Sequence, residues 1–449
     1  MKLDDRKTIF GWAMYDWANS AFATTVMAGF FPIFFKTYWS YGADVNVSTA
    51  QLGFGNSIAS LFVAVLAPFL GAIADKGSAK KKFLIFFAYL GVLMTASLFL
   101  VQKGAWAWAI FVYVMGIIGF SGANTFYDAL LPGVASEDKI DYVSGLGYGM
   151  GYLGGGLLFL GNVLMTLMPE RFGLADAEEA VRYSFVCVAI WWGVFTVFTI
   201  LWVPEEKTTA SRRGGGNVIA DGFRQFIGTF KKIRHLKTVF LFLLAYWFYI
   251  DGVDTIIRMA VDYGMSLGFD SNDLVVALLI VQFVGFPSAL AFGKLGQKWG
   301  ARKGIYLAIG VYMFVTVWGA MMTIKQEFYV LAIMIGLVQG GIQALSRSYY
   351  SRLIPKEQSA EYYGFYNMLG KFAAIIGPAL MGVVGLIVRR MLMPPAPTPD
   401  QIVHIGQLAS RWSIASILIL FLVGVILFYF VDEEKGRREA AYLLESQNT

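Results

Sequence analysis

Apolar residues occur in this chain as long blocks, separated by shorter segments that contain most of the charged residues. A helix needs ~20 apolar residues to cross the ~30 Å hydrocarbon core of a bilayer, so each block predicts one membrane-spanning helix. The predicted spans are residues 10–35, 51–74, 83–102, 106–130, 142–167, 183–203, 238–262, 273–293, 304–323, 328–350, 361–388 and 410–431. We therefore expect an all-α integral membrane protein with twelve transmembrane helices.

The composition supports this interpretation. Of the 449 residues, 57% are hydrophobic and 15% are charged, whereas a soluble domain has ~25% charged residues. This shortage of charge excludes a soluble enzyme and a nucleic-acid-binding protein. The single cysteine, Cys187, excludes an intramolecular disulfide.

The positions of lysine and arginine predict the orientation, because cytoplasmic loops carry an excess of these residues. Most of the 36 Lys and Arg residues lie in segments that are inside when both termini are cytoplasmic. The excess is greatest at Lys80–Lys82, at Arg302-Lys303 and in the central polar segment. We therefore predict cytoplasmic termini, and we interpret the net charge of +6 as a consequence of topology.

The central polar segment divides the chain into two halves of six spans each. We expect an N-terminal half at 1–203, a cytoplasmic linker at 204–237, a C-terminal half at 238–431 and a cytoplasmic tail at 432–449. From Phe223 onward the linker combines apolar residues at helical spacing with basic residues, which predicts an amphipathic helix on the inner leaflet. This helix would tether the halves, and lipid sensing is the alternative.

Both halves contain a glycine-rich, basic loop at corresponding positions. Gly71–Gly77 precedes Lys80-Lys81, and Gly293–Gly300 precedes Arg302-Lys303. This repetition predicts two pseudo-symmetric, parallel repeats. The loop resembles the signature loop of the major facilitator superfamily, with two departures. The first copy has two extra residues before its basic pair, and the second has Gln297 where an acid is common; Asp75 of the first copy is therefore the candidate for a gating latch.

Motifs that suggest enzymes lie in the wrong structural context. Gly149–Gly154 matches a dinucleotide-binding fingerprint, but it lies inside a predicted span with no preceding strand. Its glycines are better explained as a face for close helix packing. The two histidines, His235 and His404, are predicted on opposite sides of the membrane and cannot share a catalytic or metal site. We expect no enzymatic activity, no metal and no cofactor.

Polar residues inside spans are costly to insert, so each is a candidate for function. Asp16 shares a face of the first span with Asn19 and Ser20, either as a helix-packing cluster or as a contact for substrate. Asp251 shares a face of the seventh span with Asp254 and with Thr255, Arg258 and Asp262. Since a buried, uncompensated carboxylate favours its protonated form, Asp251 with Asp254 is the candidate proton-coupling pair. Arg258 with Asp254 or Asp262 suggests an ion pair at an outer gate.

Three further spans carry polar faces. They comprise Asn124 and Asp128 on the fourth span, Gln339, Gln343 and Arg347 on the tenth, and Lys371 on the eleventh. Glutamine both donates and accepts hydrogen bonds, which suits a zwitterionic or polyhydroxyl ligand. Asp128, Arg347 and Lys371 lie toward the cytoplasmic ends and could form an inner gate, while Lys371 is alternatively a cation that binds a substrate carboxylate.

Several of these segments resemble one branch of the major facilitator superfamily, the vacuole-effluxer-like family. The matching motifs are Tyr15–Phe22, Ala129–Pro132, Gly151–Gly155, Tyr249–Val253, Gln339–Ser348, Pro355, Gly364–Tyr366 and Gly370-Lys371. The resemblance implies a facilitator fold that moves small solutes by alternating access, and it suggests amino-acid export. The family is common in bacteria, so it also implies a bacterial inner membrane.

We therefore expect a monomeric, proton-coupled secondary transporter of a small polar or zwitterionic solute such as an amino acid. The expected substrate-binding residues are Asp16, Asn19, Asn124, Gln339, Gln343 and Lys371; the proton-coupling residues are Asp251 and Asp254; the gating residues are Asp75, Asp128, Arg258 and Arg347. The expected partners are the solute, the proton and the lipid bilayer. Lipid or lysolipid flipping is the main alternative, and a non-transporting receptor or a membrane-embedded enzyme is a third.

Overall fold

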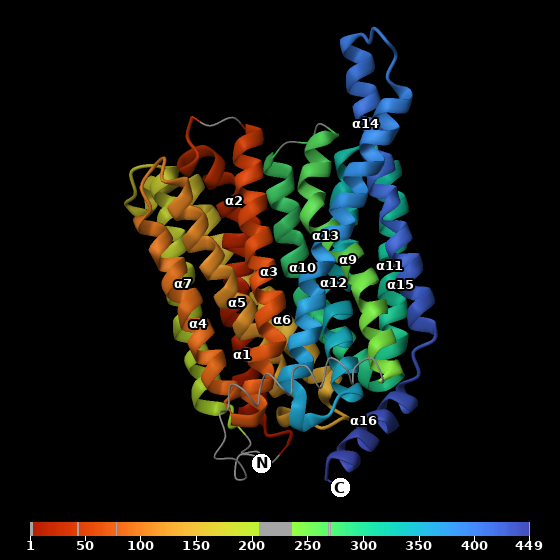
Figure 1. Ribbon diagram of the computed structural model, residues 1–449. Coiled ribbons are helices and arrows are strands. Elements are labelled where there is room, and N and C mark those ends of the chain that lie inside the picture. Colours follow the sequence, from red (N-terminus) through yellow and green to blue (C-terminus); the bar gives the residue numbers. More distant parts are fainter. Residues whose placement is uncertain are drawn as a thin grey trace. The chain divides into compact units, whose positions relative to one another are not determined.

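The computed structural model describes residues 3–42, 45–77, 79–205, 236–267, 269 and 271–448, and these residues are almost entirely helical (Figure 1). Among them, eleven helical segments are long and apolar enough to cross a membrane. These eleven coincide with eleven of the predicted spans. The remaining prediction, 361–388, falls on a helix of 34 residues, Ser359–Leu392, that is not among the eleven. The all-α membrane fold is confirmed, and the count of twelve spans stays a prediction.

The first part of the chain forms one long first span and five further helices. The helices are α1 (Arg6–Ala21), α2 (Phe31–Phe34), α3 (Val45–Gly77), α4 (Lys80–Ser97), α5 (Trp106–Val134), α6 (Ile140–Leu167) and α7 (Ala177–Trp202). Two π-helical segments, η1 (Phe22–Phe30) and η2 (Phe35–Trp39), continue α1 and α2. Two short 3₁₀ helices, η3 (Leu98–Leu100) and η4 (Pro169–Phe172), follow α4 and α6.

The second part of the chain continues in the same way. Its helices are α9 (Lys237–Ser266), α10 (Ser271–Trp299), α11 (Ala301–Met321), α12 (Lys325–Leu353), the 3₁₀ helix η6 (Lys356–Gln358), α13 (Ser359–Leu392), α14 (Pro399–Ser416), α15 (Leu418–Tyr429) and α16 (Glu433–Asn448). The amphipathic helix predicted in the linker lies outside the described residues.

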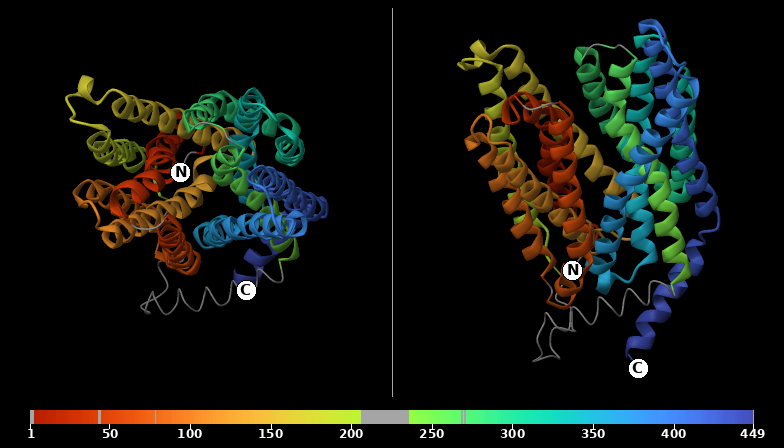
Figure 2. Two further views of the ribbon diagram at one scale, coloured as in Figure 1. Left: turned by 90° about the horizontal axis from the view of Figure 1, so that it is seen from above. Right: turned by 45° about the horizontal axis from the view of Figure 1, so that its top comes forward.

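The chain folds into two compact units. The first contains Met1–Lys232 and Ile354–Met368, and the second contains Ile233–Leu353 and Leu369–Thr449. Helix α13 therefore contributes to both, with the residues up to Met368 in the first unit and the others in the second. Within each unit the long helices pack along much of their length (Figure 2).

In the first unit, α1 packs on the glycine-rich face of α6. A Cβ atom at Gly147 or Gly151 would lie 2.5 Å from side-chain atoms of Asp16 and Ser20, respectively. One turn further, a Cβ at Gly154 would lie 2.6 Å from the carbonyl oxygen of residue 17. No side chain fits at these positions, so the glycines allow the two helices to approach closely. The structure thus agrees with the packing role predicted for this glycine face.

In the second unit, α9 is held on two sides. It packs against α15, where Gly252 faces the ring of Phe421. At its first turn, the Thr238 N–H donates to the Glu439 carboxylate of α16 at 3.1 Å. An acidic side chain at a helix N-terminus satisfies an orphan amide and favours the helix dipole. These contacts fix the helix that carries the predicted proton-coupling residues.

Candidate functional site

Asp16 is part of an aromatic hydrogen-bond cluster between α1 and α5. Its side chain is 8% exposed, and its Oδ2 accepts a hydrogen bond from the Tyr127 hydroxyl at 2.8 Å. The Tyr127 ring stacks on Trp12 with centroids 4.3 Å apart, and Trp12 Nε1 donates to the Tyr127 carbonyl at 3.1 Å. The carboxylate thus takes part in joining two helices, which favours the packing alternative for Asp16.

Asn19, one turn further along α1, pairs with Asn124 of α5. The Asn19 Nδ2 donates to the Asn124 Oδ1 at 2.5 Å. Asn19 is buried, whereas Asn124 is partly exposed. Two of the predicted substrate-binding residues are therefore brought together, and Asn124 is the more accessible of the two.

Asp75, the predicted latch, belongs to α3, and its side chain contacts the first turn of α13. Its Oδ1 accepts the Ala360 N–H at 3.2 Å and its Oδ2 accepts the Glu361 N–H at 2.9 Å. Lys80 Nζ lies 2.9 Å from Oδ1 and also donates to the Ser359 hydroxyl at 2.8 Å. A helix N-terminus leaves its first amides without partners, so this carboxylate stabilises the start of α13.

Glu205, which the sequence analysis did not single out, stabilises the other side of the same loop. Its two carboxylate oxygens accept the N–H groups of Lys80 at 2.5 Å and Lys81 at 3.2 Å. These are the first amides of α4. Glu205, which follows α7 in the sequence, therefore caps the N-terminus of α4. Glu205 directly follows Pro204 at the end of an apolar block, and an acid at that place is the signal that could have identified it.

The second copy of the loop is built differently. Gly300 connects α10 to α11 with a φ of 86°, a left-handed conformation that favours glycine. Arg302 donates to the Tyr429 carbonyl at the end of α15, at 2.7 Å. The base of this copy therefore binds a helix C-terminus, whereas the base of the first copy pairs with Asp75. The two copies of the loop thus make different contacts, and the choice of the first as the latch stays a prediction.

Asp128 belongs to α5, and its side chain contacts the N-terminal part of α13. It is 7% exposed, and its Oδ2 accepts a hydrogen bond from Asn367 Nδ2 at 3.3 Å. The Ser359 hydroxyl donates to the Ala129 carbonyl at 2.9 Å and reinforces this contact. Arg347, the predicted ionic partner, is 2% exposed on α12. Lys371 lies on α13, and its side chain is outside the described part of the structure.

Asp251 is the most deeply buried of the predicted site residues in the second unit, with an exposure of 0%. Its Oδ1 accepts two hydrogen bonds, from the Gly377 N–H at 3.0 Å and from the Thr255 hydroxyl at 3.2 Å. Its Oδ2 is buried and has no hydrogen-bond partner among the described residues. An apolar environment disfavours an ionised carboxylate that keeps an oxygen without a donor.

The other polar residues of α9 differ in exposure. Asp254 is half-buried and Arg258 is exposed, while the side chain of Asp262 lies outside the described residues. An outer gate formed by Arg258 and an acid stays a prediction. Gly377 and the pairing of Tyr127 with Asp16 were missed by sequence reasoning; the Gly377-Pro378 pair inside an apolar span was a visible signal for the first of these.

Helix α12 presents the predicted glutamines next to a contact with α9. Gln339 is 9% exposed, and Gln343 is half-buried. The hydroxyl groups of Ser346 and Tyr249 lie 2.7 Å apart and join the two helices. In the second unit the structure therefore places the acidic face of α9 and the amide face of α12 on neighbouring helices. In the part of the chain that the structure describes, no cluster of His, Cys, Asp and Glu could hold a metal ion.

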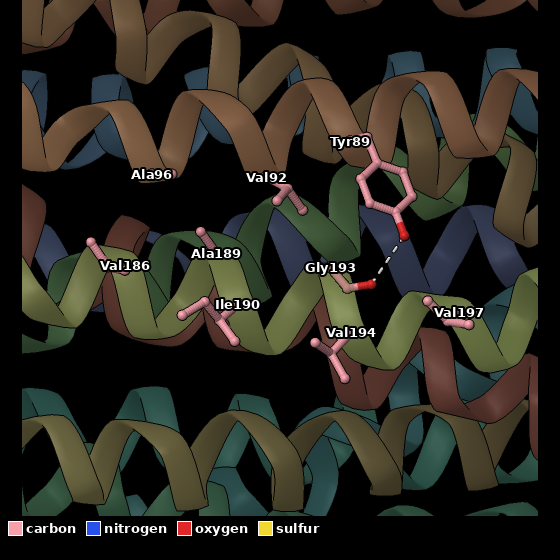
Figure 3. A pocket seen from close by; sticks show the side chains of 9 residues that line it. All are labelled: Tyr89, Val92, Ala96, Val186, Ala189, Ile190, Gly193, Val194 and Val197. Carbon is pink, nitrogen blue, oxygen red and sulfur yellow. Dashed lines mark hydrogen bonds between the residues drawn. The ribbon is translucent and has the colours of Figure 1, made fainter.

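An apolar groove between α4 and α7, of about 440 Å³, is a separate feature of the first unit (Figure 3). It is lined by Tyr89, Val92, Ala96, Val186, Ala189, Ile190, Gly193, Val194 and Val197. The Tyr89 hydroxyl donates to the Gly193 carbonyl at 3.2 Å, so the polar atom of this side chain is already bonded (Figure 3). Since Ile190 is 60% exposed on a membrane-spanning helix, the groove belongs to the lipid-facing surface rather than to the polar site.

Comparison with known proteins identifies relatives over most of the chain. The family model described as "Vacuole effluxer Atg22 like" matches residues 38–142 and 135–390. The chain is 37% identical over 425 residues to the "Uncharacterized MFS-type transporter YxiO" of Bacillus subtilis, with 94% of each chain covered. It is 23% identical to "Autophagy-related protein 22" of Yarrowia lipolytica, with 86% of this chain and 76% of that protein covered.

Solved structures show the same fold at low sequence identity. The human organic anion transporter MFSD10 matches with a TM-score of 0.67 and 13% identity, covering 95% of this chain and 100% of that one. The proton:xylose symporter XylE matches with a TM-score of 0.67 and 14% identity, covering 97% of both chains. These matches establish the major facilitator fold.

Proposed function

Because the chain belongs to the Atg22-like vacuole effluxer family of major facilitator transporters, we propose that it is a proton-coupled secondary transporter of a small polar or zwitterionic solute such as an amino acid. It is an integral, multi-pass membrane protein. We place it in a bacterial cytoplasmic membrane with both termini inside, as a monomer without enzymatic activity. The positive residues at the inner loops and the Bacillus relative support this location.

The burial of Asp251 is the observation that carries the proposal. An ionised carboxylate in an apolar interior costs several kcal/mol unless donors satisfy both oxygens, and here Oδ2 has no partner among the described residues. A proton on Oδ2 removes that cost. Asp251 is therefore the residue best suited to bind and release the coupling proton, with Asp254 as the neighbouring acid that influences it.

The same geometry favours a proton over a sodium ion. Sodium ions in transporters are coordinated by oxygen atoms such as carboxylates and backbone carbonyls. At Asp251, the groups that face Oδ1 are an N–H of Gly377 and a hydroxyl of Thr255, and both act as donors. Neither of these two groups supplies a carbonyl or a second anionic oxygen to a metal ion, so we infer that this carboxylate takes up a proton rather than sodium.

Amide side chains provide the proposed contacts to the solute. The Asn19–Asn124 pair in the first unit and Gln339 with Gln343 in the second can donate and accept hydrogen bonds, as a zwitterion requires. Asp16 supports the pair by anchoring α1 on α5 through Tyr127. Lys371 is the proposed cation for a substrate carboxylate.

Gating is assigned to charged residues at the helix ends. The bonds from Asp75 to the first turn of α13 must break when that turn moves, so they bias the equilibrium between transport states. Asp128 adds a hydrogen bond to Asn367 of the same helix. We assign Arg347 to the inner gate and Arg258 to the outer gate.

Solute flux in proteoliposomes tests the proposal. Vesicles with the purified protein are loaded with a labelled amino-acid mixture, and efflux is measured with and without an imposed pH gradient. We expect gradient-driven efflux that is lost in Asp251→Asn. Fluorescent lipids in the same vesicles test the flippase alternative. Movement of lipid without movement of any amino acid, sugar or peptide would overturn the proposed class of substrate.

A further inference from the structure

Helix α13 contains a proline directly after the residue that contacts Asp251. Pro378 lies inside this helix and has no N–H, so the carbonyl of residue 374 lacks the donor that a regular α-helix provides. The preceding residue, Gly377, directs its N–H to Asp251 Oδ1 of α9 at 3.0 Å. A side chain of a neighbouring helix therefore binds the backbone of α13 where proline already weakens it.

The contact requires a glycine. A Cβ atom at Gly377 would lie 1.8 Å from the Thr255 hydroxyl oxygen and 2.8 Å from Asp251 Oδ1. Thr255 is fully buried and donates to the same Oδ1 at 3.2 Å. Two donors, one from each helix, thus converge on one carboxylate oxygen.

The strength of this contact depends on the charge of Asp251. A hydrogen bond to an ionised acceptor is roughly twice as strong as one between neutral groups. When Asp251 is ionised, it holds the Gly377 amide strongly; when Oδ2 carries a proton, the same bond becomes weaker. Proton binding therefore changes how firmly α9 holds the part of α13 next to Pro378.

Among the described residues, few other charged groups lie on the helices around this contact. On α14, which packs against α9, Arg411 donates to the Ala320 carbonyl at 3.0 Å. Asp254, on the next turn of α9, influences Asp251 electrostatically, and Arg258 is exposed two turns away. From α15, the apolar Phe421 faces Gly252, and α12 contributes the neutral Ser346 hydroxyl to Tyr249. On α13 the next ionisable residue toward the N-terminus is Lys371, whose side chain lies outside the described residues.

A bend near Gly377 would act on a helix that contributes residues to both compact units. The residues of α13 up to Met368 belong to the first unit, where Asp75 binds the first turn. The residues from Leu369 onward belong to the second unit. A change of direction near Gly377 would therefore connect ion binding to movement of this helix.

We propose that Asp251, Thr255 and Gly377 form a proton-sensitive hinge in α13, in which deprotonation tightens the bond to the Gly377 amide and protonation releases it. This inference rests on the proposed coupling role of Asp251 and adds the structural element that responds to the proton. Thr255 and Gly377 are positioning residues, because they act through Asp251 and not on the solute.

Distances between spin labels in the full-length protein test the hinge. One label is placed on α13 beyond the proline, at Leu386→Cys, and the other on α11, at Phe314→Cys. These side chains are 71% and 54% exposed, and the natural thiol is removed by Cys187→Ser. A control pair joins Phe314→Cys to Ile419→Cys on α15, where the native side chain is 53% exposed. Pulsed electron resonance is recorded in lipid nanodiscs at acidic and at alkaline pH.

We expect the α11–α13 distance distribution to differ between the two pH values, while the control pair stays unchanged. In Asp251→Asn, which is neutral at all pH values, the acidic distribution should persist in alkaline buffer. Thr255→Val should reduce the pH-dependent shift, and Thr255→Ser, which keeps the hydroxyl, should restore it. A pH-dependent shift that survives in Asp251→Asn, or no shift in the parent protein, overturns the hinge.

Flux measured on the same variants separates this inference from the proposed function. If Asp251→Asn loses gradient-driven flux but the parent protein shows no change in distance, coupling stands and the hinge is wrong. If the distances depend on Asp251 but flux ignores the pH gradient, the hinge stands and proton coupling is wrong.

Discussion

The hydroxyl of Tyr127 donates to the Asp16 carboxylate at 2.8 Å and so connects α5 to α1 across 111 residues of sequence. Since Asp16 is only 8% exposed, losing this donor leaves a buried carboxylate oxygen with one partner fewer. Hydrogen bonds between membrane helices are worth ~0.6 kcal/mol on average and up to ~1.7 kcal/mol, and the acceptor here is a carboxylate.

We therefore predict that Tyr127→Phe lowers the free energy of unfolding by about 1–2 kcal/mol. Thermal unfolding of the purified protein in detergent measures the effect. Tyr442→Phe, at a tyrosine that is 74% exposed on α16, is the control and should change little. Equal stability of the two variants would show that the Asp16–Tyr127 bond does not hold α1 in place.

The contact between α1 and α6 predicts opposite effects for two glycines of one helix. Gly151→Ala places a Cβ 2.5 Å from the Ser20 hydroxyl oxygen, and overpacking of this kind costs ~1–3 kcal/mol. Gly161 has open space around it, so Gly161→Ala should be neutral or stabilise the helix by up to ~1 kcal/mol. Unfolding temperatures of both variants, measured side by side, decide the question. An unaffected Gly151→Ala would mean that the two helices are not in close contact.

The glycine face was visible in the sequence, whereas the main-chain partners of the charged residues were not. Helical periodicity and small-residue spacing are local, so the spans and the packing face of α6 followed from neighbouring residues. The amides that bind Asp75 belong to residues 285 and 286 positions further on, and the amide that binds Asp251 lies 126 positions further on. Main-chain donors carry no sequence signature, which explains why Asp75 and Asp251 were found as candidates while their partners were missed.

The hydrogen bonds that Asp75 accepts from the first turn of α13 predict that a substitution of Asp75 changes both stability and transport. Asp75→Ala removes the acceptor of two backbone amides and the partner of Lys80. Loss of a helix cap costs ~0.5–2 kcal/mol, so the states that contain this contact should become less populated. We expect a lower rate of solute exchange together with greater labelling of cysteines placed at the cytoplasmic ends of the helices. Glu170→Ala, at an exposed acid of η4, is the matched control. Unchanged exchange and labelling in Asp75→Ala would remove Asp75 from the gate.

Asp4 lies before the first membrane-spanning helix, and the pKa of its carboxyl predicts that the protein loses stability in acid. Burial opposes ionisation of this carboxyl, but hydrogen bonds from Ser136 and the charge of Lys139 outweigh it and hold the pKa below 3.8. A lowered folded-state pKa stabilises the fold above the ordinary value and loses that contribution as the pH falls through the folded one. Asp4→Asn should therefore unfold at a lower temperature than the parent protein at neutral pH. The difference should shrink as the pH falls below 3.8. A constant difference across this range would contradict the assignment.

Exchange and accumulation separate the coupling role of Asp251 from substrate binding. Asparagine keeps the shape of the side chain and an oxygen that can accept the Gly377 amide, but it does not titrate. We expect Asp251→Asn to retain solute exchange in the absence of a gradient, because the amide contacts at Asn124 and Gln343 are intact. Accumulation driven by a pH gradient should fall at least ~10-fold, which corresponds to ~1.4 kcal/mol of lost driving force.

Asp254→Asn is the matched variant on the same helix. Asp254 is half-buried and three residues away from Asp251, so its loss should alter the pH at which accumulation is half-maximal without abolishing it. If both variants lose accumulation and exchange together, Asp251 supports the fold or binds the solute, and the proton must enter elsewhere. Retained accumulation in Asp251→Asn with loss in Asp254→Asn would transfer the coupling role to Asp254. Only loss of accumulation with intact exchange in Asp251→Asn fits a carboxyl that carries the proton while the amides hold the solute.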